Sequence, residues 1–253
     1  MPRVAKVTGQ IHTTESGDRN GDRVVIVHGA MDRSTSFGRV ARHLADMNLI
    51  RYDRRGYGRS HDLGVGSLKD HVDDLLDVMG QVPALVFGHS FGAVVALRAS
   101  IAEPSLFRSV IAYECPASWE PWWPRRSIDD ATQPDPEREA ETFMRQAIGD
   151  RYWERLPART REQRRREGPA LVADLRSLRS GPPFDPSEIS VRVISAYGSE
   201  ADWWHRRASE ELGDNVPKAE LAVVAGAAHG VHLTHPTATA ELIRKVANGS
   251  KGL

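Results

Sequence analysis

A serine stands at the centre of the stretch Gly88-His89-Ser90-Phe91-Gly92, which follows an apolar run and precedes a segment of helical periodicity. This G-x-S-x-G pattern is typical of a sharp turn from strand to helix, in which glycines give clearance and the serine hydroxyl projects from the edge of the sheet. The backbone N–H of Phe91, at the start of the helix, is then placed to hold an oxyanion. The pattern predicts Ser90 as a nucleophile, which needs a general base and a carboxylate to orient that base.

The elements that must position this serine are short strands that alternate with helices. Six apolar runs rich in Val, Ile and Leu have the length of buried parallel strands. They are Arg23–Ala30, Asn48–Asp53, Ala84–Ser90, Ser109–Pro116, Val191–Gly198 and Ala219–Gly226. Helical segments lie between them, at Ser67–Met79, Phe91–Ala102, His205–Leu212 and Pro236–Ala247. The alternation predicts an α/β fold with a mostly parallel, doubly wound sheet, to which Val7–Gly17 adds an antiparallel edge strand or a hairpin.

The segment Ala117–Ser187 interrupts this alternation. It opens with the tryptophan- and proline-rich ASWEPWWPRR and closes with SGPPFDPS. Polar helical stretches lie between these ends, at Pro136–Ile148, Arg151–Leu156 and Arg161–Leu178. We expect an inserted helical cap at residues 117–187, with the core formed by residues 1–116 and 188–253. Glutamates are interleaved with the arginines of Arg161–Glu167, which indicates an exposed helix face rather than an anion site.

Composition narrows the class of protein. The 253 residues are enough for one α/β domain with an inserted subdomain, and 34 basic residues balance 34 acidic ones, unlike the basic excess of nucleic-acid binders. The single cysteine, Cys115, excludes an internal disulfide and is interpreted as a small buried filler. The apolar runs, of about eight residues, are too short to span a membrane, and the N-terminus lacks an apolar signal region. We expect a cytoplasmic monomer or homodimer with no nucleic-acid or membrane partner.

Two further motifs complete a resemblance to the α/β-hydrolase superfamily, which covers most of the chain outside the cap. His28-Gly29-Ala30 ends an earlier strand, and Tyr52–Ser60 resembles the D-x-R-G-x-G-x-S loop of the family. The resemblance implies that the N–H of Ala30 is the second oxyanion donor. His28 is expected to tie down its loop by hydrogen bonds. The matching loop residues Asp53, Arg55 and Gly58 are assigned to loop architecture.

The general base is expected after the last strand, where the family carries a histidine. His229 stands there, and Pro236 follows seven residues later, where the resemblance places the start of the final helix. His232 and His235 are less well placed; His232 either lines the pocket or packs at the start of that helix. These histidines have no carboxylate or cysteine nearby in the sequence at metal-ligand spacing, and no phosphate-binding or dinucleotide motif is present, so we expect no metal and no cofactor.

The carboxylate is where the sequence departs from the family pattern. Family members usually carry it as G-x-x-D after the penultimate strand, but here the third residue after Gly198 is Ala201, flanked by Glu200 and Asp202. Glu114 ends the strand that follows the nucleophile's helix, and Glu114-Cys115-Pro116 resembles the acid position of fungal resorcylic lactone hydrolases. An ionisable residue at the end of a buried strand needs a partner. Glu114 is therefore favoured, with Asp202 as the alternative acid and Glu200 or no acid remaining open.

Together these residues predict a serine hydrolase that cleaves a carboxylic ester or lactone of a small hydrophobic molecule through an acyl-enzyme intermediate. A serine nucleophile argues against dehalogenases and epoxide hydrolases of this superfamily, which use aspartate. Apolar and aromatic residues are expected to line the pocket: Met31, Trp119, Trp122, Trp123 and Trp203. The alternatives are hydrolysis of a C–C bond or thioester, lyase chemistry on the same triad, a small-molecule receptor with little turnover, and a binding protein with a broken triad.

Overall fold

The computed structural model describes residues 10–124 and 135–249, and within them seven strands form one sheet. The strands are β1 (Thr13–Gly17), β2 (Arg23–Val27), β3 (Asn48–Tyr52), β4 (Ala84–His89), β5 (Phe107–Tyr113), β6 (Val193–Gly198) and β7 (Ala219–Val224). They lie in the order β1-β3-β2-β4-β5-β6-β7. β1 is antiparallel to β3, and every other neighbouring pair is parallel. The predicted α/β sheet and its antiparallel edge strand are therefore confirmed.

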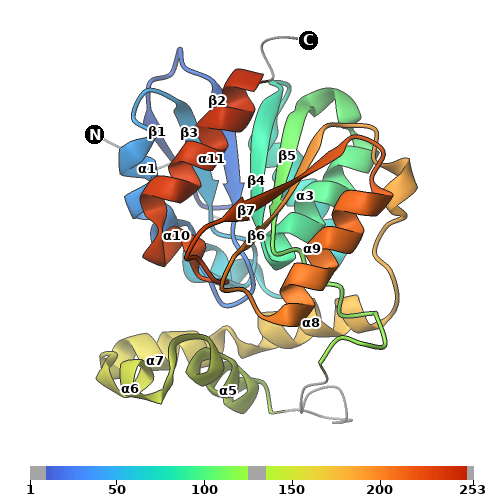
Figure 1. Ribbon diagram of the computed structural model, residues 1–253. Helices are drawn as coiled ribbons and strands as arrows, with labels where there is room; N and C mark the ends of the chain where they lie inside the picture. The colour runs from blue at the N-terminus through green and yellow to red at the C-terminus, as the bar shows by residue number, and fades with distance from the viewer. Residues whose placement is uncertain (1–9, 125–134, 250–253) are drawn as a thin grey trace.

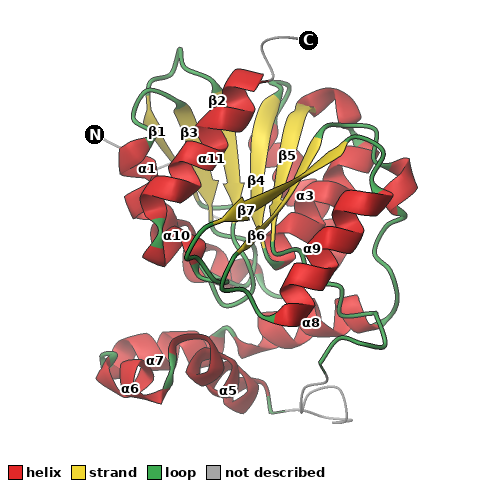
Figure 2. Ribbon diagram, viewed as in Figure 1, coloured by secondary structure: helices red, strands yellow, loops and turns green. Residues whose placement is uncertain are grey.

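Helices cover both faces of this sheet (Figures 1 and 2). The helices are α1 (Gly38–His43), α2 (Leu68–Met79), α3 (Phe91–Ala102), α5 (Pro136–Ile148), α6 (Asp150–Arg155), α7 (Ala158–Arg166), α8 (Gly168–Arg179), α9 (Trp203–Asn215), α10 (Val231–Thr234) and α11 (Pro236–Gly249). Short 3₁₀ turns occur at Ser34–Phe37, Gly58–Leu63, Pro104–Leu106 and Pro186–Glu188. None of the helices in the described ranges is both long and apolar enough to cross a membrane.

Successive side chains of β2 enter two different hydrophobic layers. Val25 and Val27 pack with residues of α2, α3 and α9, whereas Val24 and Ile26 pack with residues of α1 and α11. Strand side chains alternate between the two faces, so a strand covered on both sides must be apolar throughout. This requirement explains the continuous apolar runs in the sequence.

Local sequence signals set the ends of the helices that follow the strands. At the start of α2, the N–H of Asp70 donates to Oγ of Ser67, and the carboxylate of Asp70 accepts from the N–H of Ser67. This reciprocal capping satisfies two donors that a helix start leaves open. Helix α3 is apolar on nearly all sides because it is buried behind the sheet, and its residues Phe91–Leu97 are all buried.

Two expectations about individual elements were wrong. The edge strand β7 is not buried on both faces: Leu221 and Val223 point to the same face and are 48% and 53% exposed, so this face is only partly covered at the edge of the sheet. The predicted helix Arg161–Leu178 is two helices, α7 and α8, which meet at Gly168. A side chain at Gly168 would approach the carbonyl oxygen of Pro136 to 2.0 Å, so glycine allows the start of α8 to pass close to the start of α5.

Helices α5 to α8 form a layer beyond the lower end of the sheet, where the parallel strands end (Figure 1). They lie between β5 and β6 in the chain, and the described residues between those two strands form no further strand. Part of the predicted cap, residues 125–134, lies outside the described residues. The division into a core and a cap at residues 117–187 stays a prediction.

The end of α7 is attached to the core, which corrects the interpretation of Arg161–Glu167 as an exposed face. Glu167 is 2% exposed and pairs with Arg33 at 2.7 Å. Arg164 donates to the carbonyl oxygen of Met31 at 3.1 Å. The end of the cluster faces the core because the loop after β2 carries Arg33, which pairs with Glu167, and the carbonyl oxygen of Met31, which accepts from Arg164.

Candidate active site

Ser90 occupies a strained turn between β4 and α3. Its backbone angles are φ 54° and ψ −124°, a region that residues with a side chain rarely adopt. The N–H of Ser90 donates to the carbonyl oxygen of Tyr113 at 2.9 Å. A Cβ on Gly88 would lie 2.5 Å from Cα of Ala93, and one on Gly92 would lie 2.2 Å from the carbonyl oxygen of Val27. The flanking glycines therefore allow the close packing that holds the serine in this conformation.

The loop after β2 passes beside this turn. A Cβ on Gly29 would lie 3.0 Å from Cβ of Ser90, so the backbone of the loop is in contact with the serine. Ala30 is the next residue of the loop. Phe91 is the first residue of α3, and the first N–H groups of a helix have no acceptor within it. Both residues predicted as oxyanion donors thus belong to segments that border Ser90.

His229 and Glu114 meet at the same edge of the sheet. Nδ1 of His229 lies 2.7 Å from Oε2 of Glu114, and the N–H of Gly198 donates to Oε1 at 3.1 Å. Glu114 is fully buried, whereas the side chain of His229 is 38% exposed. A carboxylate bound at Nδ1 leaves Nε2 of the imidazole as the nitrogen that can exchange a proton with a hydroxyl.

The chain was compared with known proteins, and residues 24–242 match the alpha/beta hydrolase family. The chain belongs to this family. Lipase LipV of Mycobacterium tuberculosis is 30% identical over 104 residues, which cover 40% of this chain and 40% of the lipase, less than half of either protein. Esterase YbfF of Escherichia coli is 26% identical over 279 residues, covering 93% of this chain and 96% of the esterase. The enol-lactonase of Burkholderia xenovorans has the same fold, with a TM-score of 0.74 at 18% identity over 97% of this chain and 100% of the lactonase.

The two alternative acids, Asp202 and Glu200, make their contacts with residues other than His229. The side chain of Asp202 is 57% exposed, and its Oδ2 lies 3.9 Å from Nδ1 of His205. Glu200 is exposed and accepts from the hydroxyl of Ser199 at 3.3 Å. Of the three carboxylates considered, Glu114 is the one that the structure places in hydrogen-bond contact with His229.

His205 is a neighbour of this pair that sequence reasoning did not single out. Its ring stacks on that of His229, with centroids 4.4 Å apart and planes 16° apart. Its Nδ1 lies 3.6 Å from Oε2 of Glu114. His205 lies in the first turn of α9 and belongs to no recognised sequence motif. It reaches Glu114 and His229 because α9 packs against β6.

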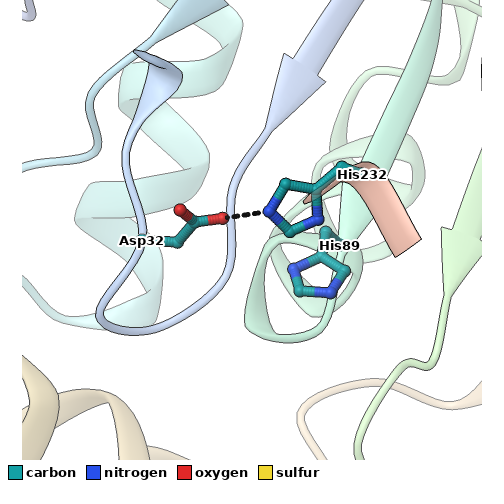
Figure 3. A group of neighbouring side chains, drawn as sticks. All are labelled: Asp32, His89 and His232. Atoms are coloured by element: carbon teal, nitrogen blue, oxygen red, sulfur yellow. Dashed lines mark ion pairs between the residues drawn. The ribbon is translucent and has the colours of Figure 1, made fainter. Parts of the chain in front are cut away.

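A second group of polar side chains consists of Asp32, His89 and His232 (Figure 3) and contacts His229 through His89. Nε2 of His89 lies 2.7 Å from the carbonyl oxygen of His229. Nε2 of His232 lies 3.1 Å from Oδ2 of Asp32, and its ring stacks on Phe37 at 4.2 Å. Of the two roles considered for His232, the structure shows packing, because the residue is 2% exposed.

Burial and the neighbouring charged groups shift the pKa values of Asp32 and His89. Burial acts to raise the pKa of Asp32, but the attraction and hydrogen bond of His232, together with the nearby His28 and His89, hold that pKa well below its usual range. Burial, with His229 and His232 nearby, lowers the pKa of His89 well below its usual value. No carboxylate stands near these histidines at ligand spacing in the sequence, but the fold brings Glu114 to His229, the partner that was favoured for it, and Asp32 to His232. Both carboxylates are far from their histidines in sequence, so spacing gave no signal.

His28 ties two loops together, as predicted. Its Nε2 accepts from the N–H of Arg54 at 2.8 Å, and its Nδ1 lies 2.7 Å from the carbonyl oxygen of Gly29. Burial, and then the nearby Arg54, lower the pKa of His28 to about 4, so it is neutral at pH 7. In the following loop, Asp53 accepts from the N–H groups of Ser34 and Arg59 at 2.7 and 2.9 Å, consistent with the architectural role expected of it.

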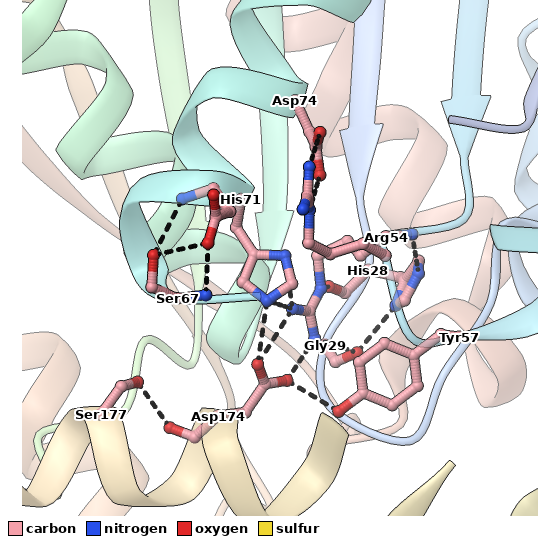
Figure 4. A network of polar contacts seen from close by, with 11 residues as sticks. His28, Gly29, Arg54, Tyr57, Ser67, His71, Asp74, Asp174 and Ser177 are labelled. Carbon is pink, nitrogen blue, oxygen red and sulfur yellow. Dashed lines mark hydrogen bonds and ion pairs between the residues drawn. The ribbon is translucent and has the colours of Figure 1, made fainter. Parts of the chain in front are cut away.

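Arg54 is a buried cation that the motif analysis passed over (Figure 4). It is fully buried and pairs with Asp174 of α8 at 2.7 Å. Asp174 also accepts from the hydroxyl of Tyr57 at 2.7 Å and lies 3.1 Å from Nε2 of His71. Burial acts to raise the pKa of Asp174, but Arg54 and His71 hold it well below its usual range. Because Arg54 also donates to the carbonyl oxygens of His28 and Gly29, this network fastens α8 to the loop after β2.

The residues predicted to line the pocket divide into three places. Trp123 meets the ring of His205 edge-on at 5.2 Å, and Trp122 contacts Trp203 at 6.2 Å. Trp119 packs on Phe184 at 6.3 Å and borders a cavity of about 110 Å³ whose lining includes neither Ser90 nor His229.

Met31 is 4% exposed and packs with residues of helices α5 and α6, among them Met144 and Trp153. Trp123 is linked to the His229–Glu114 pair through His205: it contacts the ring of His205, which stacks on His229.

Proposed function

We propose that this protein is a serine hydrolase that cleaves a carboxylic ester or lactone of a small hydrophobic molecule through an acyl-enzyme. The observation that carries the proposal is the 2.7 Å contact between His229 and the buried Glu114, at the sheet edge that holds the strained Ser90. A buried carboxylate needs a partner, and an imidazole held at Nδ1 presents its other nitrogen as a base. We therefore propose Ser90, His229 and Glu114 as the catalytic triad.

In the first step, His229 accepts the hydroxyl proton of Ser90 while the oxygen attacks the substrate carbonyl. The N–H groups of Ala30 and Phe91 stabilise the oxyanion of the tetrahedral intermediate. His229 then gives its proton to the leaving alkoxide, and the acyl group remains on Ser90. A water molecule, deprotonated by His229, releases the acid and restores the serine. Glu114 holds the imidazole in one tautomer and stabilises its charged form throughout.

A hydrophobic substrate is supported by the aromatic group of Trp122, Trp123 and Trp203 near His205. Apolar pockets with few polar groups favour apolar acyl or alcohol portions. The names of the relatives agree with this class: a lipase, an esterase and an enol-lactonase. Ester and lactone cleavage use the same attack on a carbonyl, and the proposal covers both.

The test is hydrolysis of p-nitrophenyl acetate and p-nitrophenyl octanoate by the wild type, Ser90→Ala and Ser105→Ala. Ser105 is an exposed serine in a 3₁₀ turn and serves as the matched control. We expect turnover in the wild type and in Ser105→Ala and a loss of at least about a thousandfold in Ser90→Ala. Equal turnover in all three proteins would contradict the proposal. Absence of turnover in all three would favour C–C or thioester cleavage, lyase chemistry or a receptor role.

A further inference from the structure

Three side chains from separate parts of the chain converge behind His229 (Figure 3). Asp32 lies in the loop after β2, His89 ends β4, and His232 lies in α10. One ligand atom from each lies within 4.8 Å of the others. His89 and His232 are 5% and 2% exposed. Two imidazoles and a carboxylate form a donor set that binds zinc in proteins.

The tautomer of His89 follows from its hydrogen bond. A carbonyl oxygen only accepts, so Nε2, at 2.7 Å from the carbonyl oxygen of His229, carries the proton. Nδ1 of His89 then has a lone pair. This atom is buried, and among the described residues it has no hydrogen-bond partner. Figure 3 shows this side of the ring toward Asp32. Histidines that bind metals commonly donate their other N–H to a backbone carbonyl in this way.

The other two side chains are arranged similarly. Oδ1 of Asp32 accepts from the N–H of Arg33 at 2.8 Å, which fixes the carboxylate and leaves Oδ2 toward the histidines. Oδ2 forms an ion pair with Nε2 of His232 at 3.1 Å, which Figure 3 marks. Nδ1 of His232, like Nδ1 of His89, has no hydrogen-bond partner among the described residues. Buried polar atoms without partners are costly, so a group placed among them would stabilise the protein.

One cation can accept lone pairs from all three side chains at once, from Asp32, His89 and His232. Its binding would replace the ion pair between Asp32 and His232. The nearby His28 does not compete, because both of its ring nitrogens are engaged by Arg54 and Gly29.

We propose that Asp32, His89 and His232 bind one Zn²⁺ ion, with water completing its coordination. The bound ion would fix the ring of His89, and the N–H of that ring holds the carbonyl of His229. The site would thus steady the loop that carries the proposed base without taking part in bond cleavage. A second group, Glu114, His205 and His229, offers similar atoms. There, however, an ion would displace the contact between Nδ1 of His229 and Glu114 on which the proposed triad depends, so we assign the ion to the first group.

The test is a titration of chelator-treated protein with Zn²⁺ by calorimetry, together with the visible spectrum of the Co²⁺ form. We expect one ion per chain. Removing a zinc ligand should weaken affinity beyond the 10–100-fold that loss of a supporting residue costs, so Asp32→Asn and His232→Gln should each weaken it about 100-fold or more. Glu114→Gln should bind as tightly as the wild type. Circular dichroism checks that each variant folds.

Absence of stoichiometric binding to the wild type would overturn the proposal, as would unchanged binding in a folded Asp32→Asn protein. Loss of binding in Glu114→Gln alone would move the ion to the other group and equally overturn it. If both cluster variants unfold, ¹⁵N spectra of the wild-type histidine rings decide. The resonances of His89 and His232 must shift with Zn²⁺, and a shift at His205 instead contradicts the assignment. None of these measurements requires substrate, so they are independent of the proposed hydrolysis.

Discussion

Nδ1 of His229 lies 2.7 Å from Oε2 of Glu114, although 115 residues separate the two in the chain. Glu114 extends β5 by one residue, and His229 follows β7, two strands away in the sheet. Because parallel strands end at the same edge, their following residues meet regardless of distance in sequence. The expected catalytic position after β6 holds Ala201, and the contact with Glu114 supplies a carboxylate from the neighbouring strand instead.

If Glu114 orients the base, Glu114→Gln should lower kcat strongly, whereas Asp202→Asn should leave it within about twofold. An amide of nearly the same shape no longer stabilises the charged imidazole and favours the wrong tautomer, which in a comparable triad costs about 10⁴-fold. The measurement is kcat and KM for p-nitrophenyl acetate at pH 8. The opposite ranking of the two variants would transfer the acid role to Asp202.

His205 should matter through its stacking on His229. Aromatic contacts contribute about 0.5–1.5 kcal/mol, so His205→Ala should lower kcat by up to about tenfold. His205→Phe keeps a flat ring and should retain most of the activity. Equal losses in both variants would show that the 3.6 Å approach of Nδ1 to Glu114, rather than stacking, is what counts. Full activity in His205→Ala would remove this residue from the site.

The tryptophans should discriminate by substrate size. Trp123→Ala and Trp203→Ala should raise KM for p-nitrophenyl octanoate several-fold, in line with about 0.5–1.5 kcal/mol for an aromatic contact, and change KM for the acetate little. Tyr152→Ala is the control, because Tyr152 is a 65% exposed aromatic residue of the cap helices. Parallel effects on both esters would mean that the tryptophans only support the fold.

His28 should make the folded protein sensitive to mild acid. Its pKa falls from 6.5 in the unfolded chain to about 4 in the folded state. Below pH 6.5 the unfolded chain therefore binds a proton that the folded protein does not, and stability decreases until about pH 4. The slope from this residue is about 1.4 kcal/mol per pH unit.

Urea unfolding at pH 7, 6 and 5 measures that slope in the wild type and in His28→Gln. Burial also lowers the pKa values of His12, His71 and His89, so part of the slope should persist in the variant. The difference between the two proteins belongs to His28. Identical slopes would show that His28 is protonated alike in both states.

The buried pair of Arg54 and Asp174 should be worth far more than a surface pair. Its side chains are 0% and 1% exposed, and loss of one partner leaves a buried charge, which costs about 3–5 kcal/mol. Asp174→Asn should therefore lower the free energy of unfolding by about that amount. Glu211→Gln breaks the exposed pair with Arg207 and should cost about 0.5 kcal/mol or less. Similar losses in the two variants would contradict the importance of the buried network.

The sequence by itself determined the elements whose signals are local. The apolar runs, the turn around Ser90 and the helical segment Ser67–Met79 depend on residues within a few positions of one another, so their spacing predicts them. The glycines at 88 and 92 are required because backbone lies within 3 Å of the positions where their side chains would be. The alternation of strands and helices predicts the mostly parallel sheet, and the family match confirms the fold, whereas the order of the strands is seen only in the structure.

Only the tertiary structure decided which distant side chains meet. Glu114 and Asp202 both suit the chain order of a triad, but Tyr113 pairs with Ala196 in the sheet, which places Glu114 beside the N–H of Gly198. Asp202 instead precedes α9 and is carried toward solvent. The contacts of His205 and of the Asp32 cluster have the same origin. They arise from strand register and helix packing, which join residues far apart in the chain and leave no spacing to read in the sequence.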